Sequence, residues 1–231
     1  MIKSIEFHCE DYLRGCIPEP SEASKFIPSY FRSLPSYVSG DLTSATAKKC
    51  IPFLEAVSAG FIIPLCTDVM ITVKDGDICW HTPDKSPISN IIETHTYDQI
   101  ENYPLASEPY GKMPLKFVNP WVIKTPKSVS CLFTPCLNHF ENRFLTVSGI
   151  VDTDNYYNSV NFPFIWTGGE GQFLLEKGTP LVHVIPIQRK VLKSRYKDLD
   201  IRLRDRVINM LSTTFVGGYK SLFWHKLKDK K

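Results

Sequence analysis

Between Phe61 and Arg189 the hydrophobic residues gather in short runs rich in β-branched and aromatic side chains. The runs recur at intervals of about ten residues with no helical pattern between them, which favours antiparallel strands over a parallel α/β sheet. They are Val69–Val73, Ile78–His81, Trp121–Lys124, Val129–Phe133, Phe144–Val151, Ser159–Trp166, Gln172–Leu175 and Leu181–Ile187. Lys74–Asp77, with Asp-Gly at its centre, predicts a hairpin turn between the first two runs.

The flanking regions differ from this pattern. Prolines at 18, 20, 28 and 35 interrupt the N-terminal region, so only short helices are expected there. One is predicted after a Ser21 cap and before Pro35, and a second over Lys48–Ala59. Near the C-terminus a hydrophobic residue recurs every fourth position, which predicts one face of a helix. These residues are Leu199, Leu203, Val207 and Leu211.

The pattern therefore predicts a mainly β protein, an antiparallel barrel or sandwich with short N-terminal helices and a C-terminal helix. We expect one globular unit made of three segments. Residues 1–60 are Pro-rich and partly helical, residues 61–189 form the β core, and residues 190–231 form a basic helical segment.

Composition and charge narrow the class of protein. The 231 residues are 43% hydrophobic and 22% charged, which excludes disordered and collagen-like chains. No run is long enough to span a membrane, the N-terminus lacks a secretion signal, and the seven cysteines do not suggest a disulfide framework. We therefore expect a cytoplasmic protein with reduced thiols and no membrane partner.

The charge is unevenly distributed. The net charge is +3, but from Ile185 onward 13 basic residues face 4 acidic ones. Such a basic segment attracts nucleic acid or another polyanion, or is a solvated helix face that docks on the acidic remainder of the chain.

The candidate site lies in Ser148–Tyr157 (SGIVDTDNYY), which resembles the water-activating motif of the dUTP pyrophosphatase family. Leu175–Ile185 is similar to the strand that closes that fold, and Ile123–Ser130 is similar to its strand-Pro-turn-strand entry. The resemblance covers residues 120–189. It implies a β-clip-like (dUTPase-like) core and, by analogy, assembly as a homo-oligomer, commonly a trimer.

The same resemblance implies roles for individual residues. Asp152 would hold the attacking water, and Tyr156 would stack on the sugar of a nucleotide. Mg²⁺ would be needed if the chain hydrolyses a triphosphate. In the alternative interpretation, Asp152 and Asp154 only shape the turn after a buried strand.

Several residues depart from the family pattern. The family's phosphate-binding Arg-Ser-Ser triplet is missing near Thr134–Leu137, where Arg143 and Asn138 are the nearby polar groups. The related dCTP deaminases place a glutamate base where this chain has Val160–Phe164, so deamination is not expected. We count Asp154, Tyr156, Asn161, Arg143 and Asn138 as candidate ligand-binding residues, with Asp152 as the candidate catalytic one.

Most of the chain also resembles an uncharacterised family of tailed, especially marine, phages and some bacteria. The resemblance is carried by Ile51–Ala56, Ala59–Leu65, Asn119–Trp121 and Val160–Phe164. It implies a phage origin and brings no assigned activity.

No metal site is expected from the sequence. Cys131, Cys136 and His139 have a spacing wider than that usual for structural zinc, and no fourth ligand is evident. His183, between two valines, is typical of a core histidine.

Three functions remain open. The first is a ligand-binding or catalytically degenerate module that holds a nucleotide or other small molecule. The second is a Mg²⁺-dependent nucleoside triphosphate pyrophosphatase in which Asp152 activates water. The third is a phage virion structural or assembly protein.

Overall fold

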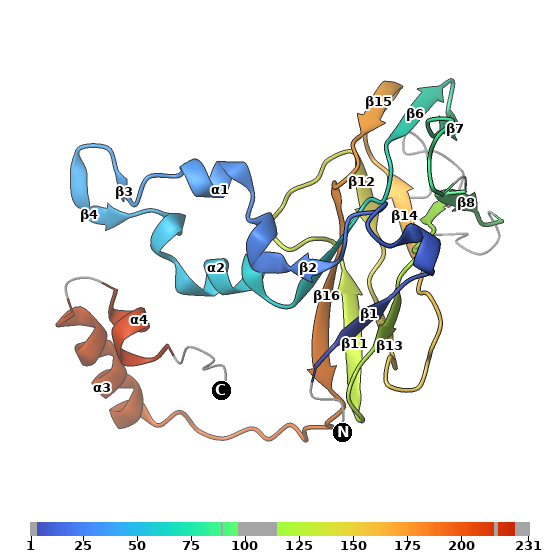
Figure 1. Ribbon diagram of the computed structural model, residues 1–231. Coiled ribbons are helices and arrows are strands. Elements are labelled where there is room, and N and C mark those ends of the chain that lie inside the picture. Colours follow the sequence, from blue (N-terminus) through green and yellow to red (C-terminus); the bar gives the residue numbers. More distant parts are fainter. Residues whose placement is uncertain (1–3, 89, 97–114, 215–216, 225–231) are drawn as a thin grey trace. The chain divides into compact units, whose positions relative to one another are not determined.

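The computed structural model describes residues 4–88, 90–96, 115–214 and 217–224 (Figure 1). Contacts within the chain group it into two compact units. Unit 1 comprises Met1–Ile27 and Val57–Arg189, and unit 2 comprises Pro28–Ala56 and Lys190–Lys231. The division expected from the sequence, into segments 1–60, 61–189 and 190–231 of one globular unit, stays a prediction.

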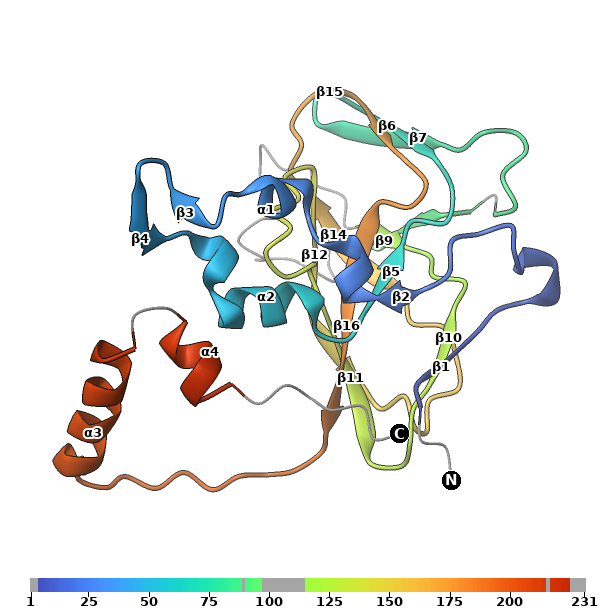
Figure 2. The same ribbon diagram turned by 60° about the vertical axis from the view of Figure 1, so that its left-hand side comes forward.

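Unit 1 is built on antiparallel sheets, and the largest has five strands. Their order is β13 (Gly149–Val151), β11 (Val129–Thr134), β16 (Pro180–Gln188), β5 (Phe61–Pro64) and β2 (Ser21–Glu22). Figure 2 shows β11 and β16 side by side, and their register runs from Val129 opposite Gln188 to Thr134 opposite His183. This pairing sets which loops meet at each end of β11.

The remaining strands of unit 1 form three smaller sheets. One has the order β12 (Phe144–Thr146), β14 (Phe162–Trp166), β9 (Leu115–Phe117) and β8 (Ile92–Thr94). A second has the order β15 (Gly171–Leu175), β6 (Val69–Lys74) and β7 (Asp77–His81), and a third pairs β1 (Glu6–His8) with β10 (Val122–Lys124). The predicted fold class, a mainly antiparallel β protein, is confirmed. The barrel alternative is wrong, because these sheets do not close on themselves within the described part of the chain.

The β6–β7 hairpin forms where the sequence predicts it. Lys74 pairs with Asp77, and the two central residues both have positive φ, 53° at Asp75 and 82° at Gly76. A two-residue turn of this kind matches the right-handed twist of the strands and favours Asp-Gly. The local sequence therefore predicts the position and type of this turn.

The core of unit 1 follows from the alternation of side chains along each strand. In β6, Val69, Ile71 and Val73 are buried and the residues between them are more exposed. In the next sheet Phe117 and Phe164 stack with ring centroids 3.9 Å apart. Burial of these apolar surfaces is the main stabilising term of the unit.

Gly60 marks the entry of the chain into β5. Its φ is +63°, and a Cβ at this position would overlap the carbonyl oxygen of Val184 in β16. Its own carbonyl oxygen accepts a hydrogen bond of 3.0 Å from the Ala23 amide. Only glycine combines the left-handed backbone with this close approach.

Two predicted elements differ from the structure. Phe144–Val151 is not one strand, because β12 and β13 belong to different sheets. Ser21 does not cap a helix, because it pairs with Ile62 in the five-stranded sheet. The helical residues after it form a 3-10 helix, Ala23–Phe26, and a separate α1 (Ser29–Ser33) that begins after Pro28.

Unit 2 contains short elements. Two strands, β3 (Tyr37–Val38) and β4 (Asp41–Ala45), pair with each other, and Phe31 of α1 stacks on Phe53 with centroids 4.9 Å apart. The helices beyond α1 are α2 (Ile51–Ser58), which crosses the boundary between the units, α3 (Ile201–Ser212) and α4 (Gly218–Leu222). Two further 3-10 helices are Asp11–Leu13 in unit 1 and Ala47–Lys49 in unit 2. The predicted C-terminal helix is thus present as α3.

In the part of the chain that the structure describes, every helix is too short or too polar to cross a lipid bilayer.

Candidate functional site

The candidate site begins at the turn that follows β13. The carbonyl oxygen of Asp152 accepts hydrogen bonds of 2.9 Å from the amides of Asn155 and Tyr156. The Thr153 hydroxyl lies between the Thr125 hydroxyl, at 2.7 Å, and the Cys131 thiol, at 3.4 Å. These contacts attach the turn to the loop between β10 and β11, so Asp152 and Asp154 have fixed positions.

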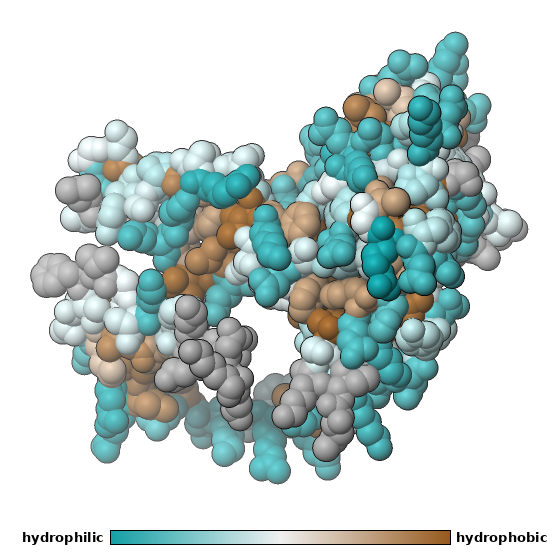
Figure 3. All heavy atoms as spheres, in the orientation of Figure 1, coloured by the Kyte–Doolittle hydropathy of each residue, from teal (hydrophilic) through white to brown (hydrophobic). Residues whose placement is uncertain are grey.

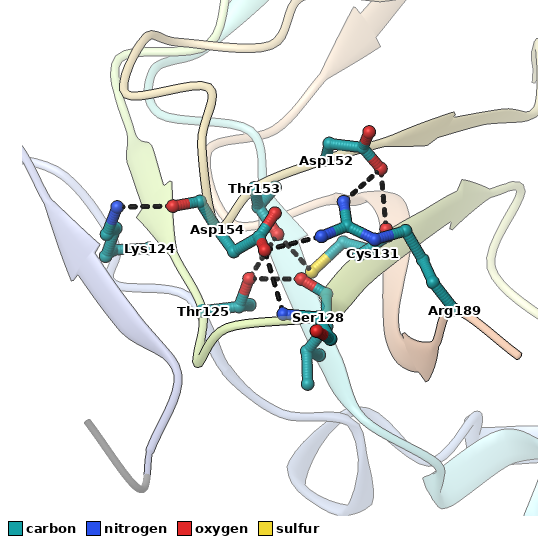
Figure 4. Close-up of polar contacts among 10 residues, drawn as sticks. Lys124, Thr125, Ser128, Cys131, Asp152, Thr153, Asp154 and Arg189 are labelled. Atoms are coloured by element: carbon teal, nitrogen blue, oxygen red, sulfur yellow. Dashed lines mark hydrogen bonds and ion pairs between the residues drawn. The ribbon is translucent and has the colours of Figure 1, made fainter. Parts of the chain in front are cut away.

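Arg189, directly after β16, joins the two carboxylates (Figure 4). Its Nη1 lies 2.7 Å from Asp152 Oδ1, and its Nη2 lies 2.5 Å from Asp154 Oδ2. The guanidinium donors are arranged as a planar fork, which suits binding of two acceptors at once. The register of β11 with β16 brings Arg189 here, and the Arg189 amide bonds to the Ser128 carbonyl at 3.2 Å.

The two carboxylates have different environments. The Asp154 side chain is 4% exposed and its Oδ2 also accepts the Ser128 amide at 2.8 Å. Its Oδ1 is buried and has no hydrogen-bond partner among the described residues. The Asp152 side chain is 59% exposed, and its Oδ1 accepts the Ser130 hydroxyl at 2.7 Å.

These contacts lower the pKa of both carboxyl groups. The Ser130 hydroxyl and then Arg189 lower the pKa of Asp152, whereas Arg189 and then the Ser128 amide lower that of Asp154. The carboxylates in turn raise the pKa of Arg189. A carboxylate whose anionic form is stabilised in this way is a weaker general base than an unpaired one.

A cavity of about 530 Å³ lies beside Asp154. It is lined by Lys124, Thr125, Pro126, Lys127, Ser128, Asp154, Asn155 and Arg189. Three of these side chains are cationic and one is anionic. Lys124 Nζ donates to the Asp154 carbonyl oxygen at 2.5 Å, which places the ammonium at the turn.

A second, larger cavity of about 750 Å³ adjoins the first through Thr125 and Pro126, which line both. Its lining is mixed, with apolar side chains including Ile5, Phe7 and Phe61 and the acidic Glu19 and Glu22. The loop between β10 and β11 therefore separates a basic hollow from a more apolar one.

The other predicted ligand-binding residues do not join this site. The Tyr156 ring is exposed and its hydroxyl accepts Asn158 Nδ2 at 3.3 Å. Asn161 Oδ1 accepts the Asn119 amide at 3.1 Å. Neither residue lines the two cavities described above. Their role in binding stays a prediction.

Arg143 and Asn138 lie at the opposite end of β11. Asn138 follows Thr134, whereas Asp152 contacts Ser130 near the start of that strand. Arg143 forms a bidentate ion pair with Glu141, at 2.8 Å from each carboxylate oxygen, and its Nη1 donates to the Leu174 carbonyl at 3.0 Å. The strand between the two ends spans about 17 Å at the usual rise per residue, so one small ligand does not contact both groups.

Sequence reasoning missed Arg189, Ser130 and Lys124 as parts of the site. Each contacts the turn from a segment more than twenty residues away in the sequence. For Arg189 the only signal was a basic residue just past the predicted strand Leu181–Ile187. Its partners depend on a strand register that the sequence does not show.

The pairing of the carboxylates with Arg189 bears on the Mg²⁺ that a triphosphate-hydrolysing chain would need. Among the described residues no group of three or more His, Cys, Asp or Glu side chains is placed to hold a metal ion. Arg189 takes one oxygen of each aspartate, and a guanidinium between two carboxylates excludes a cation from the same place. The Mg²⁺ that the pyrophosphatase alternative would need therefore stays a conditional prediction.

No family model matches the chain, and no curated protein matches it. Among solved structures, the chain is similar to dUTPases. One is a mutant dUTPase from phage phi11 of S. aureus that coordinates a structural Mg(II) ion, with a TM-score of 0.39, 8% identity, and coverage of 86% of this chain and 97% of that one.

Two further similar structures are dUTPases as well. The EIAV enzyme has a TM-score of 0.32 and 16% identity, over 62% of this chain and 86% of that one. A mutant dUTPase of Staphylococcus bacteriophage 80alpha with dUpNHpp has a TM-score of 0.38 and 8% identity, over 86% and 89%. Scores this low carry no argument about what this chain binds or does, so the function is argued below from the residues.

Proposed function

We propose that this protein binds a phosphorylated small molecule, such as a nucleotide, beside Asp154 and does not hydrolyse it. The observation that carries the proposal is the lining of the cavity, in which Lys124, Lys127 and Arg189 surround a single carboxylate. Cationic side chains that converge on one hollow attract phosphate groups and form short charge-assisted hydrogen bonds with them.

The adjoining cavity supports a ligand with an organic part. Phe7, Phe61 and Val129 offer apolar surface there, and Glu19 and Glu22 offer acceptors. A molecule that crosses Thr125 and Pro126 could place its phosphate groups against the lysines and its ring against the apolar surface. Pockets for small ligands commonly combine such apolar walls with a few polar groups.

The contacts of Asp152 support the expectation that the protein does not hydrolyse its ligand. Ser130 and Arg189 both bind its Oδ1 and lower its pKa, so the carboxylate has little tendency to accept a proton from water. We therefore expect a binding module rather than a hydrolase.

Calorimetric titration of the full chain with deoxynucleoside mono-, di- and triphosphates tests the proposal. We expect binding to at least one of them, and an affinity at least about tenfold weaker when Lys124→Gln and Lys127→Gln are combined. The matched control is Lys74→Gln with Lys85→Gln, which removes the same charge from exposed positions outside the cavity. A flat titration, or equal losses in both variants, would overturn the proposal.

The pyrophosphatase alternative has one observation in its favour. Asp152 is 59% exposed, so water reaches its carboxylate. Pyrophosphate release from nucleoside triphosphates in the presence of Mg²⁺ decides between the two functions. Release that disappears in Asp152→Asn would establish the alternative, and the binding proposal expects no release from either protein.

Two predictions from the sequence stay predictions. Light scattering on the purified chain tests the homo-oligomer, with a mass three times that of the chain expected for a trimer. Mass spectrometry of purified virions and of infected cells tests the phage structural role. Detection of the protein in infected cells but not in virions would exclude a role in the virion.

A further inference from the structure

The segment 190–197, here called the basic segment, leads from the end of β16 towards α3. It contains no helix or strand, and Figure 2 draws it as a long open trace. Every one of its residues is exposed, and four of the eight are cationic. Hydrophilic side chains line the lower edge of Figure 3, where Figure 1 draws this segment.

The cations of the basic segment are not neutralised locally. Lys190, Lys193, Arg195 and Lys197 form no ion pair with any residue that the structure describes. No acidic residue occurs between Pro186 and Lys197. Asp198 directly follows the segment and forms no ion pair with the described residues, and Asp200 caps α3 at the Leu203 amide. Asp205 pairs with Arg204.

An aromatic ring lies within this run of charge. Tyr196 is 97% exposed and stands between Arg195 and Lys197 in the sequence. A ring flanked by cations suits a polyanion that carries flat apolar groups. Single-stranded nucleic acid has this chemistry, because its phosphates are regularly spaced and its unstacked bases have open faces.

We propose that the basic segment binds single-stranded nucleic acid, with Lys190, Lys193, Arg195 and Lys197 contacting phosphates and Tyr196 stacking on a base. A duplex is a poorer partner because its bases are already stacked on each other. A partner that offers only negative charge, such as an acidic protein surface, leaves the tyrosine without a role. This binding is independent of the nucleotide site proposed above, which uses other residues.

Fluorescence anisotropy of the full chain with a labelled deoxythymidine oligomer of about 20 nucleotides tests the proposal, since this length exceeds typical site sizes. The affinity should fall with salt, with a slope of log K against log salt of about −3 for four phosphate contacts. Changing Lys193, Arg195 and Lys197 together to glutamine should reduce the slope to about −1 and weaken binding at least tenfold at low salt.

Two comparisons separate this site from general charge attraction. Arg202→Gln, Arg204→Gln and Arg206→Gln, combined, remove the same charge from α3 and should weaken binding less than about threefold. Tyr196→Ala should weaken binding at least about fivefold, and Tyr196→Phe should restore it, because the ring and not the hydroxyl stacks.

Three outcomes would overturn the proposal. They are the absence of binding to the oligomer at low salt, equal losses in the two triple variants, and equal or tighter binding to the duplex of the same length or to vesicles containing phosphatidylserine. Circular dichroism of each variant shows whether α3 is intact, so loss of folding is recognised as such.

Discussion

Unit 1 and unit 2 differ in how they use apolar side chains. In unit 1 the residues of successive strands interlock, and Phe117 and Phe164 are 0% and 1% exposed. Among the described residues of unit 2 only Phe31, at 2%, is buried to this degree. Large apolar side chains such as Leu192 and Tyr196 are instead exposed there, at 89% and 97%.

The difference indicates a division of roles. Unit 1 gains its stability from burial, whereas unit 2 relies on a few ring contacts and polar contacts, such as those of Lys48 Nζ with the Phe31 and Arg32 carbonyls. Regions with few buried apolar contacts open at lower free energy than a packed core. The residues of the proposed nucleotide site lie in unit 1, and the basic segment lies in unit 2.

The strongest way to test this comparison is to remove a ring from the core of unit 1. Phe117→Ala deletes a fully buried side chain that stacks on Phe164 and meets Phe144 edge to face. We expect the free energy of unfolding of unit 1 to fall by about 3–5 kcal/mol. Urea unfolding followed by tryptophan fluorescence measures it, since Trp80, Trp121 and Trp166 lie in unit 1. A loss below about 1 kcal/mol would contradict the burial account.

Acidification should also affect unit 1. Burial lowers the pKa of His139 and of His183, and His183 lowers that of His139 further. Because burial disfavours the charged form of both histidines and unfolding removes that burial, their contribution to stability is fully present above pH about 6.5 and is lost as the pH falls below it.

The matched variants are His139→Gln and the exposed His81→Gln. The first should flatten the decline of unfolding free energy between pH about 6.5 and 5, and the second should leave it unchanged. Parallel declines in the wild-type chain and His139→Gln would show that this histidine is not the cause.

A smaller effect is expected from the ring pair of unit 2. Phe53→Ala removes the partner of Phe31, and Phe53 is only partly buried, so we expect a loss of about 1–2 kcal/mol. Far-ultraviolet circular dichroism and the fluorescence of Trp224, the tryptophan of unit 2, report the change. A loss of unfolding free energy as large as that expected for Phe117→Ala would contradict the view that unit 2 depends less on buried apolar side chains than unit 1.

The smallest change in the free energy of unfolding is expected for a substitution on the surface of α3. Arg204 pairs with its neighbour Asp205 at 2.8 Å, and both side chains are about half exposed. Arg204→Gln should change the free energy of unfolding by no more than about 0.5 kcal/mol, because solvent screens such pairs. A thermal melt of the variant should therefore overlay that of the wild-type chain.

The elements that the sequence predicts well are those with local causes. The β6–β7 turn follows from Asp75-Gly76, and β16 follows from its nearly continuous run of apolar residues. The break between β12 and β13 was missed because Phe144–Val151 reads as one hydrophobic run. The direction of the strand changes there, since the Val147 amide bonds to Pro163 while Gly149 pairs with Phe133.

The candidate site was predictable only in part. The Asp152–Asp154 turn was visible from its residue types, and whether these aspartates act on a ligand stays a proposal. Arg189 was not visible as their partner, because a one-residue change of register between β11 and β16 would carry it to another position. Pairings between distant strands depend on the packing of the whole unit, which no short motif encodes.

The close approach of Gly60 to β16 has a consequence for engineering. Every other amino acid there would press its first side-chain carbon into the backbone of β16 and would also resist the left-handed turn. In a library randomised at that codon, the folded members should thus all carry glycine. A selection for soluble expression would therefore test the backbone conformation between α2 and β5.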